Sequence, residues 1–285
     1  MYKVNLPIFI EVETSSFCNR TCTWCPNGWS KRGRRKEYIS DEVWNDILND
    51  LQLVDYEGWF AFHNYNEPLA DPTIFEKIVQ ARQKLKYAKL VIFTNGDFLN
   101  QEILNKLIDV GINQIRIMLY PGKDSIFEEP KPQIIEECLT RLGIIQKDIF
   151  ISQDWHFLAI VPVRNAELHI MAPRVQKYHN RGGSVPLKEL STPRTKPCFL
   201  PYRSAAIDYH GNLKLCCEIY DTTLNENQIY VIGNVAKEGF LKLWFSQKMN
   251  YYREQISKAN FSEFKACQYC KYILDDDQLA ELTPL

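Results

Sequence analysis

Three cysteines near the start of the chain, Cys18, Cys22 and Cys25, have the spacing of a metal-binding loop. Their C-x3-C-x2-C pattern is too compact for a disulfide framework and one ligand short of a closed zinc site. Three thiolates also leave one iron of a four-iron, four-sulfur (4Fe–4S) cluster without a protein ligand. An iron with a vacant position can bind a small molecule, so the spacing predicts a reactive centre. A structural metal loop and a chance arrangement are the alternatives.

Four further cysteines form two separated pairs. Cys198 and Cys216 have Gly211 between them, and Cys267 and Cys270 form a C-x2-C pair. Two such pairs can assemble a four-thiolate site, and Gly211 would allow a hairpin to turn beneath it. Taken alone, this spacing suits a zinc ribbon as well as an iron–sulfur cluster.

The remaining two cysteines lie outside both sets. Cys138 lies in an apolar helical pattern and is predicted to be a buried core thiol. Cys217 directly follows Cys216, and strand alternation would point the two side chains to opposite faces. If Cys216 faces a metal, Cys217 can face the interior, where a thiol can give a hydrogen atom to a carbon radical. The alternative is a bystander residue.

Composition limits the classes of function. The chain has 285 residues, an apolar fraction of 45% and a net charge of −1, which predict a globular protein and give no reason to invoke nucleic acid or an anionic membrane. No apolar run is long enough to span a bilayer. The cysteines and the lack of a signal-peptide pattern favour reduced thiols in the cytoplasm. A basic cluster at 31–36 is expected to be a solvated loop or a docking site for phosphate or an electron donor.

Apolar segments alternate with helical ones, the order typical of a parallel β/α barrel or sheet. Beyond a proline-rich stretch at 184–197, a hairpin is expected at 205–217 around Gly211, followed by an aromatic helix. We therefore predict an α/β fold with two domains, 1–185 and 186–285. The expected strands are 8–13, 58–65, 90–93, 115–119 and part of 155–163, and the expected helices begin at 41 and cover 71–87, 100–110, 133–146 and 166–179.

The first cysteine motif, with Trp24 just before Cys25, resembles the signature of the radical S-adenosylmethionine (SAM) enzymes. The resemblance implies a partial (β/α) barrel in which SAM binds the open iron and is cleaved to a 5′-deoxyadenosyl radical. It also implies that the cluster loop is 14–27 and that Trp24 packs near the adenine. A flavodoxin or ferredoxin is the implied reductant.

Residues at strand ends are the further candidates for SAM binding, because catalytic groups of β/α folds collect there. Glu67-Pro68 matches the end of a motif that binds the SAM amino group in this family, although its glycines are replaced here. Asn95, in Thr94-Asn95-Gly96, is similar to another family motif or forms a plain turn. Arg164 follows the fifth expected strand and suits the SAM carboxylate, since guanidinium binds carboxylates in bidentate fashion; a surface salt bridge is the alternative.

The second cysteine set, combined with the first, resembles the shortened auxiliary-cluster ("twitch") domain of the SPASM/twitch subgroup. That resemblance implies two 4Fe–4S clusters, one bound by Cys18, Cys22 and Cys25 and one by the four later cysteines. The leading hypothesis is epimerisation of a sugar or aminocyclitol with Cys217 as hydrogen-atom donor. The alternatives are oxidation of a secondary alcohol through the auxiliary cluster, peptide modification, and a non-catalytic iron–sulfur or zinc protein. The candidate substrate contacts are Asn64, Asp97, 181–183, Asp208 and Glu218.

Overall fold

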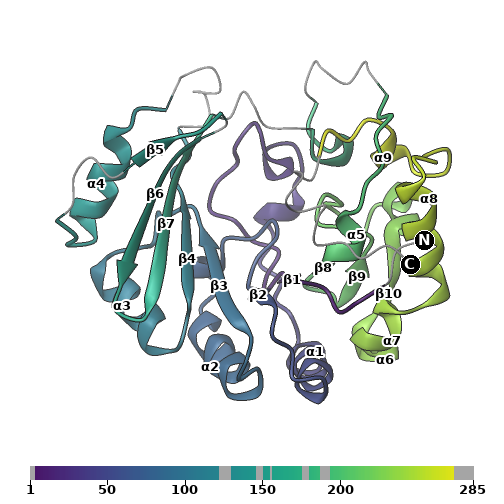
Figure 1. Ribbon diagram of the computed structural model, residues 1–285, viewed down its shortest axis with the longest axis horizontal. Helices are drawn as coiled ribbons and strands as arrows, with labels where there is room; N and C mark the ends of the chain where they lie inside the picture. The colour runs from purple at the N-terminus through teal and green to yellow at the C-terminus, as the bar shows by residue number, and fades with distance from the viewer. Residues whose placement is uncertain are drawn as a thin grey trace.

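The computed structural model describes residues 4–121, 130–145, 150–154, 156–174, 180–186 and 193–272. Within them, one curved sheet crosses the molecule in the order β10-β9-β8-β1-β2-β3-β4-β7-β6-β5 (Figure 1). The strands are β1 (Phe9–Val12), β2 (Trp59–Ala61), β3 (Lys89–Thr94), β4 (Gln114–Met118), β5 (Phe150–Ser152), β6 (His156–Val163), β7 (Ala166–Pro173), β8 (Ser204–Ile207), β9 (Asn212–Lys214) and β10 (Val231–Asn234).

Six neighbouring strands, from β8 through β1 to β7, are parallel, and the strands at both edges are antiparallel. The α/β fold with a mainly parallel sheet is therefore confirmed. Parallel strands place their carboxyl ends at one edge of the sheet, where ligands usually bind.

Helices cover the outer side of the sheet (Figure 1). The α-helices are α1 (Asp41–Leu53), α2 (Ile74–Lys84), α3 (Gln101–Asp109), α4 (Gln133–Arg141), α5 (Leu200–Arg203), α6 (Val235–Glu238), α7 (Phe240–Trp244), α8 (Gln247–Ser257) and α9 (Lys265–Gln268). Ser40 caps α1 as predicted, accepting a bond from the backbone N–H of Val43, and Asn100 caps α3 in the same way. No helix among these is long and apolar enough to cross a bilayer, over the part of the chain that the structure describes.

Alternation along the strands separates an apolar face from a polar one. Ile10 and Val12 of β1 are fully buried in the core beneath the helices, which leaves Glu11 on the inner face. His63, just beyond β2, and Arg116 of β4 reach the same inner side, since both flank the ring of Phe93. The concave side of the sheet is therefore charged, and the core lies on its convex side.

One predicted element is wrong. The sequence analysis expected a helix from 166, but 166–173 is strand β7, paired with β4 and β6. Leu168 and Ile170 are fully buried while Glu167 and His169 point to the other face, which is the two-residue period of a strand. Residues 175–179 of that expected helix lie outside the described residues.

The expected hairpin forms from β8 and β9, with Gly211 in its turn at a φ of +83°. Because β8 also pairs with β1, the sheet continues across the predicted domain boundary at 185–186. The two-domain division itself stays a prediction.

Candidate active site

The loop carrying Cys18, Cys22 and Cys25 begins at the carboxyl end of β1. The backbone N–H of Cys25 donates to the carbonyl of Cys22 (3.1 Å), and that of Gly28 donates to the carbonyl of Cys25 (2.9 Å). A Cβ on Gly28 would lie 2.3 Å from the Cys22 oxygen, so this return of the chain requires glycine. The three thiols are close enough for their charges to interact.

A polar clamp fixes the same loop to the end of β3. Arg20 donates to both carboxylate oxygens of Asp97, with Nε 2.7 Å from Oδ2, and Asn19 donates to the same oxygen (2.7 Å). Asn95 donates to the side-chain oxygen of Asn19 (2.8 Å). The sequence analysis proposed Asp97 as a substrate contact, whereas the structure places it in this clamp.

Glu67 lies where β2 and β3 end, almost fully buried. Its carboxylate accepts bonds from the Thr94 hydroxyl (2.7 Å) and from the backbone N–H groups of Asn95 (2.8 Å) and Leu69 (3.1 Å). Burial raises the pKa of this carboxyl to about 7 in spite of those donors. These contacts hold Asn95 beside the cysteine loop, and direct binding of the SAM amino group by Glu67 stays a prediction.

Trp24 is buried against Tyr120, which follows β4, with ring centroids 5.8 Å apart. The pair forms a small apolar cluster with Cys22 and Cys25, separate from the main core. Trp24 thus lies at the same edge of the sheet as Glu67 and Asn95. The packing of adenine against it remains a prediction.

Arg164 does not join this group. It lies in the turn between β6 and β7, with a φ of +56°, and pairs with Asp109 at the end of α3 (2.6 Å). Since β7 is parallel to β4, this turn lies at the amino ends of the parallel strands, opposite the cysteine loop. This position does not support the proposed binding of the SAM carboxylate by Arg164. The sequence analysis misplaced Arg164 because it mistook the strand that follows it for a helix.

The second cysteine set is assembled from distant segments. Cys198, Cys216, Cys267 and Cys270 line one small cavity of about 20 Å³, together with Arg194 and Glu218. Cys216 comes from the segment after β9, and Cys267 and Cys270 come from α9 and its end. The backbone N–H of Cys198 is held by the carbonyl of Ile256 in α8 (3.0 Å).

The chemistry of both sets fits iron–sulfur clusters. Burial raises the pKa of all seven thiols, to about 12 for Cys18, Cys22 and Cys270, so they are neutral until a metal displaces their protons. Over the described residues, no three Cys, His, Asp or Glu side chains are drawn together tightly enough for a single ion. In a 4Fe–4S cluster each thiolate binds a different iron, so this looser spacing does not count against a cluster.

Between the two sets lies a group of buried charges on the inner face. The Cys217 thiol is hydrogen-bonded to Glu11, and His63 Nε2 lies 3.4 Å from the same carboxylate. Lys214 is fully buried and donates to Asn64 (2.7 Å), while Arg181 pairs with Glu218 (3.1 Å). Cys217 therefore lies on the inner side beside Glu11, although it stands in a turn after β9 and not in the strand that the sequence analysis expected, and its role is untested. Asp208, another proposed substrate contact, instead holds the β8–β9 turn through Asn212.

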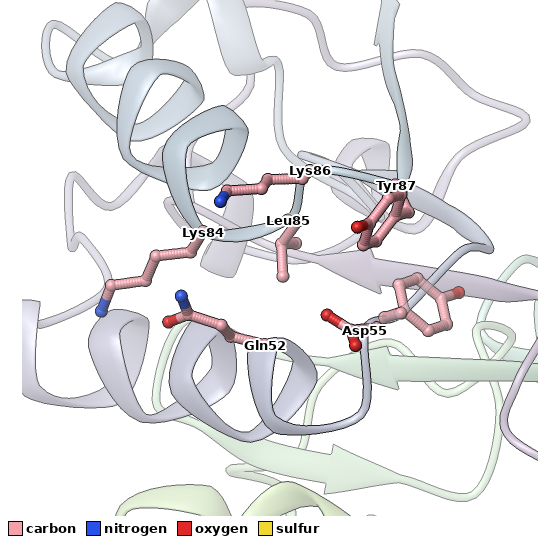
Figure 2. Close-up of a pocket in the computed structure, with 7 residues that line it drawn as sticks. Gln52, Asp55, Lys84, Leu85, Lys86 and Tyr87 are labelled. Carbon is pink, nitrogen blue, oxygen red and sulfur yellow. The ribbon is translucent and has the colours of Figure 1, made fainter.

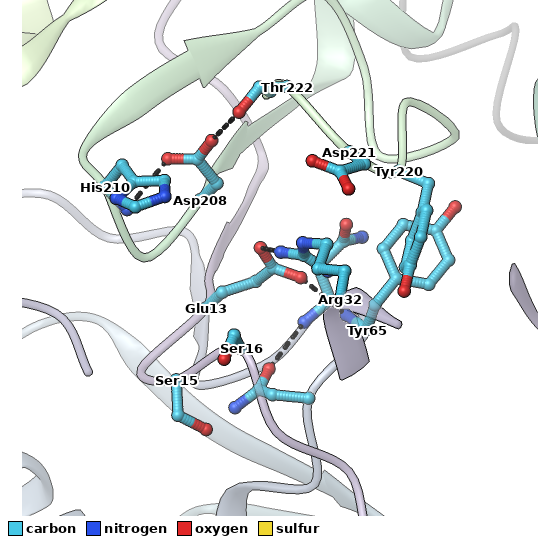
Figure 3. Close-up of polar contacts among 12 residues, drawn as sticks. Glu13, Ser15, Ser16, Arg32, Tyr65, Asp208, His210, Tyr220, Asp221 and Thr222 are labelled. Carbon is cyan, nitrogen blue, oxygen red and sulfur yellow. Dashed lines mark hydrogen bonds and ion pairs between the residues drawn. The ribbon is translucent and has the colours of Figure 1, made fainter. Parts of the chain in front are cut away.

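The sequence analysis missed a buried ion pair between Glu13 and Arg32 (Figure 3). The guanidinium of Arg32 lies 4.8 Å from the ring centre of Tyr220, and Glu13 also accepts the backbone N–H of Tyr65 (3.0 Å). The pair connects the cysteine loop, the end of β2 and the segment after Cys216. The sequence analysis counted Arg32 as one residue of the basic cluster. The available signal for its partner was the position of Glu13, an acidic residue directly after an apolar strand.

Another cavity lies elsewhere. About 100 Å³ in volume, it is lined by Gln52, Asp55, Lys84, Lys86 and Tyr87 between the ends of α1 and α2 (Figure 2). No cysteine lines it, and helices α1 and α2 end there, at the amino ends of the parallel strands.

Comparison with known families agrees with this geometry. The radical SAM superfamily model matches residues 12–129, and the model of the SPASM iron–sulfur cluster-binding domain matches residues 198–271. The first match begins at the last residue of β1 and runs through the cysteine loop to beyond β4, and the second contains all four later cysteines. The chain is therefore a radical SAM enzyme with a C-terminal SPASM region, and the two matches support SAM binding and 4Fe–4S cluster binding.

Individual relatives align over nearly the whole chain. One is the S-adenosyl-L-methionine-dependent 2-deoxy-scyllo-inosamine dehydrogenase of Niallia circulans, 25% identical over 264 residues, which are 93% of this chain and 92% of the relative. Among solved structures, BtrN in complex with AdoMet and 2-DOIA superimposes with a TM-score of 0.71 at 21% identity, over 95% of each chain. BtrN in an open conformation gives 0.64 at 19% identity, over 94% of each chain. At these identities the structural matches show the fold alone.

Proposed function

We propose that this enzyme oxidises a secondary alcohol of an aminocyclitol to a ketone. The observation that carries the proposal is the end-to-end similarity to a relative named as a 2-deoxy-scyllo-inosamine dehydrogenase, over 93% of this chain. That name favours oxidation by a dehydrogenase over epimerisation, although the sequence analysis placed epimerisation first. The charged inner face supports the same substrate class, because hydroxyl and amino groups need polar partners when buried.

We assign the first cluster, which binds SAM, to Cys18, Cys22 and Cys25, and a second, fully protein-ligated cluster to Cys198, Cys216, Cys267 and Cys270. When bound, these groups supply the radical that removes the carbon-bound hydrogen and the acceptor for the remaining electron. Glu67 positions Asn95, which in turn donates to Asn19 of the cysteine loop. The Arg20–Asp97 clamp holds that loop against β3.

Glu11 is the proposed acceptor of the alcohol proton. It lies on the inner face beside Cys217, and burial raises its pKa to about 7, so it can take up a proton near neutral pH. Glu218 and Arg181 lie on the same side and suit an amino and a hydroxyl group respectively. Oxidation then balances as loss of a hydrogen atom from carbon, a proton from oxygen to Glu11, and one electron to the acceptor.

Epimerisation remains the second candidate because of one observation. The Cys217 thiol faces the interior and is hydrogen-bonded to Glu11, which is where a hydrogen-atom donor to the substrate would need to lie. The same thiol in a dehydrogenase would compete with oxidation by returning a hydrogen atom to carbon.

A single experiment separates the two reactions. The anaerobically reconstituted enzyme is incubated in heavy water with SAM, dithionite and 2-deoxy-scyllo-inosamine. We expect one ketone for each 5′-deoxyadenosine, and the Cys217→Ala variant should keep this product. An epimer carrying solvent deuterium, lost in Cys217→Ala, would establish epimerisation instead. SAM cleavage with neither product would exclude this substrate.

A further inference from the structure

The basic cluster of the sequence is unused by the catalytic site. Lys31, Arg34, Arg35 and Lys36 are all exposed, and the preceding Trp29 leaves 56% of its surface open to solvent. We call these five residues the basic loop. The whole chain has a net charge of −1, so four exposed cations within six residues are a local concentration of charge. Arg32 is the exception in this run, since it turns inward to Glu13.

The basic loop is attached directly to the cysteine loop. The indole N–H of Trp29 donates to the carbonyl of Thr23 (2.8 Å), which lies between Cys22 and Cys25. On the other side, the Ser16 hydroxyl donates to the carbonyl of Arg35 (2.8 Å), two residues before Cys18. The Lys36 ammonium lies 5.1 Å from the ring centre of Phe17. These contacts place the exposed charges at both ends of the loop that we assign to the SAM-binding cluster.

The buried Arg32 anchors the basic loop to the protein interior. Its ion pair with Glu13 is inside the protein, and Arg32 also lies 5.1 Å from the ring centre of Tyr209. The cations of the basic loop take no part in this buried ion pair. Lys31 and Arg34 flank it in sequence and are exposed. Folding therefore needs one cation of the run, and the exposed ones repel each other at a small cost in stability. A partner with negative charge would relieve that repulsion.

We propose that the basic loop is the docking surface for an acidic electron-carrier protein that reduces the cluster held by Cys18, Cys22 and Cys25. Electron transfer falls steeply with distance, so such a donor must dock close to the cluster, and one hydrogen bond connects exposed Trp29 to the cysteine loop. Complementary charge speeds encounter, and an exposed tryptophan with arginines is the composition of a protein-binding hot spot. The inference rests on the proposed function only through that first cluster.

The test uses charge reversal of Lys31→Glu, Arg34→Glu and Lys36→Glu in one variant. The matched control is Lys86→Glu, Lys237→Glu and Lys242→Glu, three exposed lysines away from the cysteine loop with the same change in net charge. The probe is a purified flavodoxin with its reductase and NADPH. Binding of oxidised flavodoxin is measured by calorimetry at low and high salt, and 5′-deoxyadenosine formation is measured with flavodoxin or with dithionite as the reductant.

We expect the basic-loop variant to weaken flavodoxin binding by about tenfold or more at low salt and to lose most of its salt dependence, because opposite charges no longer attract. Flavodoxin-driven SAM cleavage should fall to match, while dithionite-driven cleavage stays within about twofold of wild type, since that small reductant needs no docking surface. The control should behave as wild type.

Three results would overturn the proposal. If the control variant lost flavodoxin binding to the same extent, the loss would come from the change in net charge and not from the basic loop. Equal loss of dithionite-driven cleavage, with lower iron content, would make the basic loop a support for the cluster. A milder variant, Lys31→Gln with Lys36→Gln, should show a smaller loss of flavodoxin binding at wild-type iron content; unchanged binding there would also count against docking. Ketone formation with dithionite tests the proposed function separately.

Discussion

Glu11 is the residue whose environment bears most directly on catalysis. Burial raises its pKa to about 7, while Lys214 and Arg181 lower it and Glu218 raises it further; Cys217 donates to it and His63 lies beside it. A carboxyl with a raised pKa is neutral below that pH and becomes a carboxylate above it. Only the carboxylate can accept the alcohol proton, so the turnover number for ketone formation should rise with pH through about 7.

Substitution of this residue tests its role. Glu11→Gln keeps the shape but cannot accept a proton, so ketone formation should fall by about a hundredfold and lose its rise with pH, a loss typical of a general base. The measurement is ketone produced per minute from pH 6 to 8.5, with SAM cleavage followed in the same samples. Glu102→Gln, an exposed change on α3, is the control. A wild-type pH profile in Glu11→Gln would remove the proton-acceptor role.

At the scale of elements, the buried Glu13–Arg32 pair joins the segment after β1, the end of β2 and the segment after Cys216. Removing one member of a buried ion pair leaves the other charge without a partner, which costs about 3–5 kcal/mol. We therefore expect Arg32→Met to lower the free energy of unfolding by that amount in urea denaturation. Arg34→Met, a neighbouring exposed change, should stay within about 0.5 kcal/mol.

A double variant separates the electrostatic contribution of the ion pair from the packing of Arg32. In Glu13→Gln with Arg32→Met no unpaired charge remains, so a large part of the lost stability should return. If the double variant is as unstable as Arg32→Met, the loss comes from packing against Tyr209 and Tyr220 and the electrostatic account fails.

Local signals predicted the elements up to β4 well, because caps and apolar periodicity are short-range. Ser40 and Asn100 begin helices where expected, and the cysteine spacing identified the class of enzyme. The first wrong prediction comes after β4, where the regular β/α order led us to expect a helix from 166. Residues 166–173 begin with alternating buried and more exposed positions and form strand β7, and the same error misplaced Arg164. The pairing of Glu13 with Arg32 was missed for another reason. An ion pair across 19 residues of irregular loop leaves no periodic trace in sequence.

For the whole molecule, the decisive feature is that one sheet carries both cysteine sets. Pairing of β8 with β1 places the hairpin that leads to Cys216 and Cys217 beside the strand that leads to Cys18. The two sets therefore lie on either side of one charged interior, represented by Glu11 and its neighbours. Such an arrangement suits a substrate held between a radical source and an electron acceptor.

This arrangement predicts that the later cysteines can be removed without loss of the first reaction. Cys267→Ser with Cys270→Ser should lower the iron content by about four atoms per chain, the content of one 4Fe–4S cluster. SAM cleavage under dithionite should persist, because Cys18, Cys22 and Cys25 are untouched, while ketone formation should be lost with the acceptor. Cys138→Ala, a buried thiol of the main core, controls for removing a cysteine and should keep its iron. Iron analysis beside the two product assays decides the matter: ketone formed at the wild-type rate by the double variant would show that the later cysteines do not take the electron.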